Sequence, residues 1–218
     1  MERFAGNRRI AGWFALASIA LVVVLNGAPF FTNASKPPRG IASPLVAMEV
    51  VQNVDEVDAI LSDAPSPDRE TMRIKQYVDF FFIAAYAGLY ISLARLIRTK
   101  TALFASFCGV FAAFFDIVEN IGILRILDRP LRAASQGMID AIRYPSLAKW
   151  ALVFVASALL GKVFWNYRRV PMRIVAVLSF AAAGLGIIGI YDNSFLVWAS
   201  LPLFGGIATM AIAFVFLR

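Results

Sequence analysis

The sequence predicts an all-α, polytopic membrane protein: a six-transmembrane-helix bundle with an outer amphipathic helix. The 218-residue chain is 60% hydrophobic and 16% charged, whereas about a quarter of the residues of a soluble domain are charged. Apolar runs of about 20 residues, long enough to cross a hydrocarbon core about 30 Å thick, recur along the chain. They predict membrane spans at residues 10–31, 77–97, 102–125, 147–166, 172–191 and 195–217.

These spans leave room for one transmembrane domain over residues 1–218, with an extramembrane loop at 32–76. The first apolar run is longer than the core of a usual signal peptide, so we expect a retained helix. Within the loop, Ser43 and Pro44 have the order of an N-cap followed by a first-turn proline, which is typical of a helix start. Apolar residues follow at helical spacing and predict an amphipathic helix at 44–62. A second short helix is predicted at 131–143.

Basic residues predict the orientation of the chain. They crowd the N-terminal flank and the two shortest connections, and such clusters mark the cytoplasmic side of a membrane protein. Both termini are therefore expected in the cytoplasm, with loop 32–76 on the opposite side. Tyrosine and tryptophan residues predict an aromatic belt at each membrane surface; one contains Trp13, Trp165 and Tyr167, and the other Tyr77, Tyr144, Trp150, Tyr191 and Trp198.

Composition excludes several classes of site and partner. The net charge of +7 comes without a nucleic-acid motif, and basic residues in a membrane protein mostly set topology, so we expect no nucleic-acid partner. The chain has no histidine and a single cysteine, Cys108, which removes the usual ligands of zinc and haem. The segment "GLGIIG" at 184–189 matches the dinucleotide fingerprint in letters only, because that fingerprint requires a strand-to-helix turn. No haem, zinc or dinucleotide site is expected, and small residues in this helix predict close packing.

The segment "AAFFDIVENIG" at 112–122 places polar residues inside an apolar run. Asp116, Glu119 and Asn120 stand at positions i, i+3 and i+4, so they share one helix face. A charge at the centre of a membrane helix costs about 2.5–3.5 kcal/mol on insertion scales, and such residues often serve a function. They form either an outward-facing polar pocket, which binds a cation, moves a proton or acts as acid and base, or a buried network that fixes helix packing.

Further polar residues are predicted to converge at the same depth. Asp79 opens the second span and is followed on one stripe by Tyr86 and Tyr90, while Asn26 ends the first span and Asp192 lies between the last two. The cationic partners suggested by position are Arg125 and Arg129 at the outer end of the third span.

Three stretches carry a resemblance to known proteins: "LVAMEVVQNVDEVDAIL", "YVDFFFIAAYAGLY" and "FFDIVENIGILRIL". Over residues 43–127 the chain resembles a loose group of uncharacterised bacterial integral membrane proteins with an Asp-x-x-Glu-Asn transmembrane helix. The resemblance implies a bacterial inner-membrane location and no particular activity. It adds Glu49 to the candidate polar cluster, beside its matching positions Asp79, Asp116, Glu119 and Asn120.

Three functions remain open on the sequence. The first is a periplasm-facing acidic cavity, formed by Asp116, Glu119, Asn120, Asp79, Glu49 and Tyr86, that binds a small, cationic or lipid-borne ligand. The second is a structural or accessory subunit with protein partners in a larger membrane complex. The third is an enzyme acting on a lipid with carboxylate acid and base residues, for which Asp79, Asp116 and Glu119 offer an all-oxygen metal site. Membrane lipids are expected partners in each case.

Overall fold

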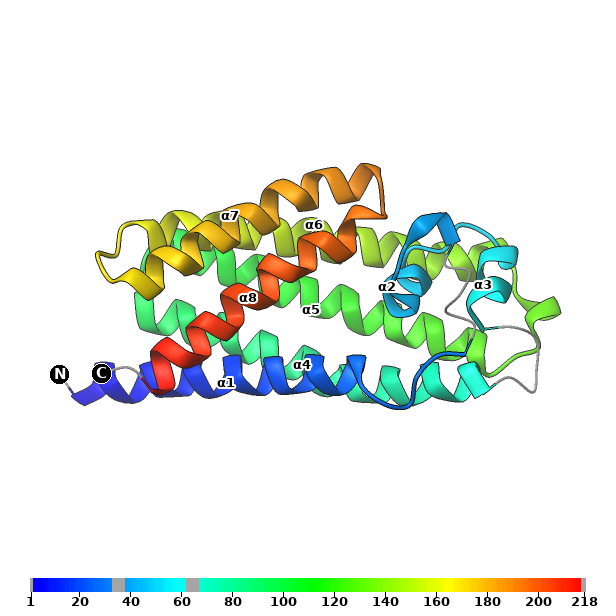
Figure 1. The fold of residues 1–218 in the computed structure, drawn as a ribbon, viewed down its shortest axis with the longest axis horizontal. Helices are drawn as coiled ribbons and strands as arrows, with labels where there is room; N and C mark the ends of the chain where they lie inside the picture. The colour runs from blue at the N-terminus through cyan, green and yellow to red at the C-terminus, as the bar shows by residue number, and fades with distance from the viewer. Residues whose placement is uncertain (1, 33–37, 62–66, 217–218) are drawn as a thin grey trace.

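The computed structural model describes residues 2–32, 38–61 and 67–216, which fold into helices connected by short loops (Figure 1). Within these residues there are eight α-helices, two short 3-10 turns and no strand. Six of the helices are long and apolar enough to cross a membrane: α1 (Glu2–Asn26), α4 (Pro67–Ile97), α5 (Lys100–Leu127), α6 (Gln136–Trp165), α7 (Val170–Tyr191) and α8 (Phe195–Val215). The predicted fold class, an all-α polytopic bundle with six spans, is confirmed.

The six long helices form a closed ring. Each packs chiefly against two neighbours, in the order α1, α4, α5, α6, α7, α8 and back to α1. Helix α1 begins and helix α8 ends at one end of the bundle, here called the terminal end, while α2 (Pro44–Glu49) and α3 (Val54–Leu61) lie at the other, the capped end (Figure 1). Helix α8 runs obliquely, from α7 near the capped end to α1 near the terminal end (Figure 1).

Two clusters of buried apolar side chains fill the ring. Towards the terminal end, residues of all six long helices pack together, among them Ala15, Leu93, Phe164 and Phe214. At the capped end, residues of α2 and α3 pack onto α4, α5, α6 and α8 through a second cluster that includes Met48, Leu61, Ile123, Ile142 and Leu196. The amphipathic segment of the loop therefore serves as a lid on the bundle, and it covers the end of the ring with apolar side chains.

The prediction of one amphipathic helix over 44–62 is wrong in its continuity. Ser43 does cap the helix start, since its Oγ accepts the Val46 N–H at 3.5 Å and Pro44 occupies the first turn. Helix α2 ends at Glu49, however, and Asn53 opens α3 by accepting the Glu56 N–H on its side chain at 2.9 Å. The break exists because Asn53 is itself a good helix-capping residue.

Two predicted spans are too short, because α4 begins at Pro67 rather than residue 77 and α6 begins at Gln136 rather than residue 147. The separate helix predicted at 131–143 is therefore a 3-10 turn, Leu131–Ala133, followed by the first turns of α6. A hydropathy pattern stops at charged residues, but two cations of the α4 extension, Arg69 and Lys75, are buried as caps of other helices.

Arg69 donates to the carbonyl oxygens of Ile126 and Leu127 at the end of α5, both at 3.0 Å. Lys75 donates to the carbonyl oxygens of Leu25 at 2.5 Å and Gly27 at 2.8 Å, at the end of α1. The last carbonyl groups of a helix lack partners within the helix, so these two cations satisfy acceptors that would otherwise stay unpaired.

The predicted end of the first span differs from the end of α1, and parts of the predicted loop and of the last span lie outside the described residues. The first span was predicted to reach residue 31, but α1 ends at Asn26 because Gly27 and Pro29 follow, and both residues disfavour a continuing helix. Residues 33–37 and 62–66 of the predicted loop, which include the end of helix 44–62, and residue 217 of the last predicted span lie outside the described residues.

The glycines of "GLGIIG" differ in their surroundings, which makes them a test of the packing interpretation. A Cβ on Gly186 would overlap the ring of buried Phe154, whereas a Cβ on Gly184 would meet no atom within 4 Å. Gly186→Ala should lower the free energy of unfolding by about 1–3 kcal/mol, the usual cost of overpacking. Gly184→Ala, the matched control, should leave thermal unfolding in detergent unchanged; equal unfolding temperatures of the two variants would contradict close packing at Gly186.

Candidate functional site

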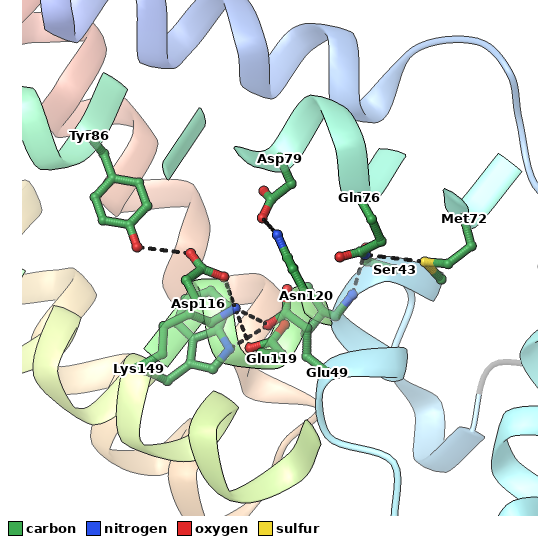
Figure 2. A network of polar contacts seen from close by, with 12 residues as sticks. Ser43, Glu49, Met72, Gln76, Asp79, Tyr86, Asp116, Glu119, Asn120 and Lys149 are labelled. Atoms are coloured by element: carbon green, nitrogen blue, oxygen red, sulfur yellow. Dashed lines mark hydrogen bonds and ion pairs between the residues drawn. The ribbon is translucent and has the colours of Figure 1, made fainter. Parts of the chain in front are cut away.

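Three carboxylates surround the ammonium group of Lys149 inside the ring (Figure 2). Lys149 Nζ lies 2.8 Å from Glu119 Oε2, 3.0 Å from Asp116 Oδ1 and 3.1 Å from Glu49 Oε2. Side-chain exposure is 8% for Lys149, 6% for Asp116 and 1% for Glu119, so water does not screen these ion pairs. The Lys149 cluster, as we call these four residues, joins α2, α5 and α6.

Local helix geometry explains why these side chains meet. Asp116 and Glu119 are one turn apart on α5 and face α6, which contributes Lys149. Residues three apart on a helix lie on one face, so both carboxylates reach the same ammonium group. Glu49 is the last residue of α2 and extends from the lid into the ring. The lid is thus tied to the transmembrane core by an ion pair.

Three neutral groups extend the Lys149 cluster. The Tyr86 hydroxyl donates to Asp116 Oδ2 at 2.9 Å, and the Trp150 indole donates to Glu49 Oε2 at 2.8 Å. The Asn120 amide donates to Asp79 Oδ2 at 2.7 Å. The Asn120 bond fixes Asp79 beside the cluster without giving it a cation, since no ion pair is formed by Asp79 among the described residues.

A cavity of about 350 Å³ opens beside the cluster. Asp79, Asp116 and Glu49 line it on one side with Lys149, the one cation among the described residues of its wall. Apolar side chains make up most of the remaining wall, among them Val22, Leu25, Phe82, Val153, Phe204 and Ile207. The cavity lies between the two apolar clusters of the ring. One side of its wall carries carboxyl groups, and the other side is apolar.

The cavity wall also carries an unsatisfied hydrogen-bond acceptor. Gln76 is 4% exposed, and its Oε1 has no hydrogen-bond partner. Its Nε2 donates weakly to Met72 Sδ at 3.5 Å, and in Figure 2 the oxygen points away from Met72, on the side where Asp79 lies. A buried polar atom without a partner is unfavourable by roughly 1–3 kcal/mol, but this oxygen has almost no accessible surface, so a donor in the cavity would reach it only if neighbouring side chains moved.

The charges of the site do not balance within it. Asp79, Asp116, Glu119 and Glu49 supply four carboxyl groups, and Lys149 supplies the one ammonium group, which contacts the last three of them. Unpaired charge in a site of low dielectric constant is strongly unfavourable. The site therefore favours additional positive charge, either as protons on the carboxyl groups or as a cationic group in the cavity.

All six predicted site residues lie together: Asp116, Glu119, Asn120, Asp79, Glu49 and Tyr86. Asn26 lines the cavity as well, although its amide donates to the Val22 carbonyl of its own helix. Asp192 does not join them, because it lies in the α7–α8 turn and accepts from Ser194.

The cationic partner was predicted wrongly, since it is Lys149 rather than Arg125 or Arg129. Lys149 stands at the start of the predicted fourth span in "SLAKWALVF". A charged residue inside an apolar run is a signal in its own right, and it could have identified this lysine. Trp150 does not belong to an aromatic belt either, because it is 7% exposed and bonded to Glu49.

The all-oxygen metal site considered for Asp79, Asp116 and Glu119 is not assembled. Within the described ranges, no three Asp, Glu, Cys or His side chains are arranged to hold a metal ion. The physical reason is that the Lys149 ammonium group occupies the position between Asp116 and Glu119, and Asp79 is turned towards Asn120.

Comparison of the chain with protein-family models, curated proteins and solved structures found no match. The resemblance carried by the Asp-x-x-Glu-Asn helix therefore stays a prediction. What the site can do follows from its geometry and its charges.

Removal of the central cation tests whether the Lys149 cluster stabilises the fold. Lys149→Met leaves three buried carboxylates without their cation and should lower the free energy of unfolding by about 3–5 kcal/mol. Lys162→Met on the same helix is the matched control, because Lys162 is exposed, and it should change stability by less than about 0.5 kcal/mol. Thermal or denaturant unfolding in detergent measures the stability of both variants. Equal stability of the two would contradict a stabilising role of the Lys149 cluster.

A compensating variant separates charge from side-chain shape. Neutralising Asp116 and Glu119 in the Lys149→Met background, as Asp116→Asn and Glu119→Gln, should restore a large part of the lost stability. The reason is that the cost arises from unpaired charge rather than from a missing side chain. A triple variant that is less stable than Lys149→Met alone would show that the carboxylates stabilise the fold without the lysine.

Proposed function

We propose that this multi-pass membrane protein binds a small, cationic or lipid-borne ligand in the cavity beside the Lys149 cluster. One observation carries the proposal: a cavity of about 350 Å³ whose polar side carries three carboxyl residues, of which Asp79 forms no ion pair among the described residues. Hydrogen-bond acceptors and negative charge together match a ligand with a positively charged or donor-rich group. The apolar side of the wall matches a hydrocarbon part.

A packing role explains the Lys149 cluster but not its surroundings. Lys149, Asp116 and Glu119 satisfy one another and would stabilise helix packing without a ligand. Asp79 has no cation among the described residues, and apart from its hydrogen bond to Asn120 of α5 it borders the open volume of the cavity. Small-molecule sites commonly combine a mostly apolar wall with a few convergent polar groups, and this cavity has both.

We further propose that the protein lies in a bacterial inner membrane, with the capped end facing the periplasm and both termini in the cytoplasm. Arg95, Arg98, Arg168 and Arg169 surround the short connections of the terminal end. At the capped end, Arg69 and Lys75 are used to cap helices. When the basic residues that cap helices are set aside, those that can determine the membrane topology favour the terminal end as the cytoplasmic side.

Neutralising Asp79 tests ligand binding without disturbing the Lys149 ion pairs. Asp79→Asn should weaken binding of dodecylamine by about 10- to 100-fold, the value of one hydrogen bond to a charged group. Asp58→Asn, on the exposed face of α3, is the control and should bind like the wild type. Binding is measured as ligand-induced stabilisation against thermal unfolding in detergent.

The uncharged isostere dodecanol separates charge recognition from hydrophobic binding. The wild type should be stabilised more by dodecylamine than by dodecanol at equal concentration, and Asp79→Asn should lose this difference. Equal stabilisation by the two compounds, or an unchanged dodecylamine affinity of Asp79→Asn, would count against the proposed function.

The orientation is tested with single cysteines in a Cys108→Ala background. Ala59→Cys on α3 at the capped end should react with a membrane-impermeant maleimide added to intact cells, since residue 59 is exposed. Asn166→Cys at the terminal end, which is also exposed, should react only after the membrane is opened. The reverse pattern would invert the proposed topology.

A further inference from the structure

We infer that the cavity opens sideways into the bilayer between α1 and α8, and that its ligand is a single-chain amphiphile with an amine head that arrives from the surrounding lipid. This inference rests on the proposed function and deepens it by naming the class of ligand and its route. Four features of the structure lead to this inference. They are the divergence of α1 and α8, the apolar rim of the cavity between them, the closure of the cavity by the lid, and the hydrogen-bond acceptors of the cavity wall.

Helices α1 and α8 touch closely at the terminal end and separate towards the capped end. A Cβ on Gly12 would lie 2.7 Å from Val215 Cγ2 and 2.9 Å from Phe214 Cβ, so the two backbones are in close approach there. Towards the capped end, α8 crosses away from α1 to meet α7 (Figure 1). The cavity is lined by Val22 and Leu25 of α1 and by Leu201 and Phe204 of α8, which places it where the two helices diverge.

The rim of the cavity on this side is apolar and accessible. Leu201 lines the cavity and is nevertheless 57% exposed, so the cavity reaches the molecular surface beside it. Val23 and Val24 of α1 are 66% and 52% exposed, and Trp198 of α8 is 61% exposed. In a helix that crosses a membrane, exposed apolar side chains face lipid. An acyl chain can therefore pass this rim without losing its hydrocarbon surroundings.

The lid closes the cavity towards the water phase. Ala47, Met48, Val50 and Val51 are fully buried where α2 and its following turn pack onto the bundle. Arg39 ties this turn to the α7–α8 connection, because its guanidinium donates to the Val50 carbonyl at 2.5 Å and to Asn193 Oδ1 at 2.9 Å. Access for a ligand is accordingly easier from the bilayer than through the lid.

The polar wall selects the head of the ligand. Asp79 and Glu49 offer acceptors, whereas the ammonium group of Lys149 is already engaged by three carboxylates. A phosphate or carboxylate head would face like charge, and an ammonium head would meet complementary groups. A volume of about 350 Å³ is at the small end of the range of ligand pockets, about 300–1,000 Å³, and this suits one chain rather than two.

The test compares a long amine with a short one in a variant whose opening is narrowed. The full chain is placed in phosphatidylcholine nanodiscs with hexadecylamine, and retained amine is counted by native mass spectrometry; butylamine binding is measured by thermal stabilisation. Leu201→Trp fills the opening from α8 and should reduce hexadecylamine retention at least tenfold. Butylamine binding by the same variant should fall much less than hexadecylamine retention, because the short amine can pass a narrower opening and still reach the acids.

Matched variants separate the effect of a narrowed opening from other effects of an added tryptophan. Ile212→Trp adds the same ring to a lipid-facing position of α8 that is 54% exposed and away from the cavity, and it should retain hexadecylamine fully. Val22→Trp narrows the opening from α1 and serves if Leu201→Trp does not fold. Equal hexadecylamine retention by the narrowed variants and Ile212→Trp would overturn the lateral route while leaving the proposed function standing. A wild type that binds neither amine would overturn both.

Discussion

The ion pairs between Lys149 and its three carboxylates are the interaction on which the rest of the structure depends. They join α5 to α6 inside the membrane, and through Glu49 they join the lid to both. Charges in the apolar interior are tolerated when each finds a partner of opposite sign. Because one lysine pairs with several acids, the Lys149 cluster holds the helices in place. The Asp79 carboxyl group is left without a cation at the edge of the cavity.

The arrangement of the helices in the ring places this excess of carboxyl groups beside an open volume. Its two apolar clusters fill the space towards each end, so the open volume lies between them at the depth of Asp79 and Gln76. Helix α8 runs obliquely (Figure 1), and its Leu201 lines the cavity while being 57% exposed, from which we infer an incomplete wall on that side. Packing, charge and opening are thus consequences of the same arrangement, and the accessory-subunit and lipid-enzyme hypotheses stay predictions.

Much of the fold and most of the candidate site could be predicted from the sequence. Six apolar runs predicted the six spans, and the spacing of Asp116, Glu119 and Asn120 predicted their common face. Hydropathy missed the first turns of α4, because Arg69 and Lys75 bury their charges against helix ends, and those of α6, because Asp140 and Arg143 interrupt the apolar pattern there. The sequence pattern also missed Lys149, since which helix supplies a counter-charge depends on the order of helices around the ring. The lateral opening depends on the tilt of α8, which no local pattern encodes.

A density map of the protein, purified in nanodiscs with lipids carried over from the membrane, would test the central claim most directly. We expect elongated density in the cavity, with its polar end within hydrogen-bond distance of Asp79 and its tail directed between α1 and α8. A cavity closed by protein side chains, with Asp79 paired to Lys149 or to an arginine, would contradict the ligand-binding interpretation and leave a cluster that serves helix packing alone.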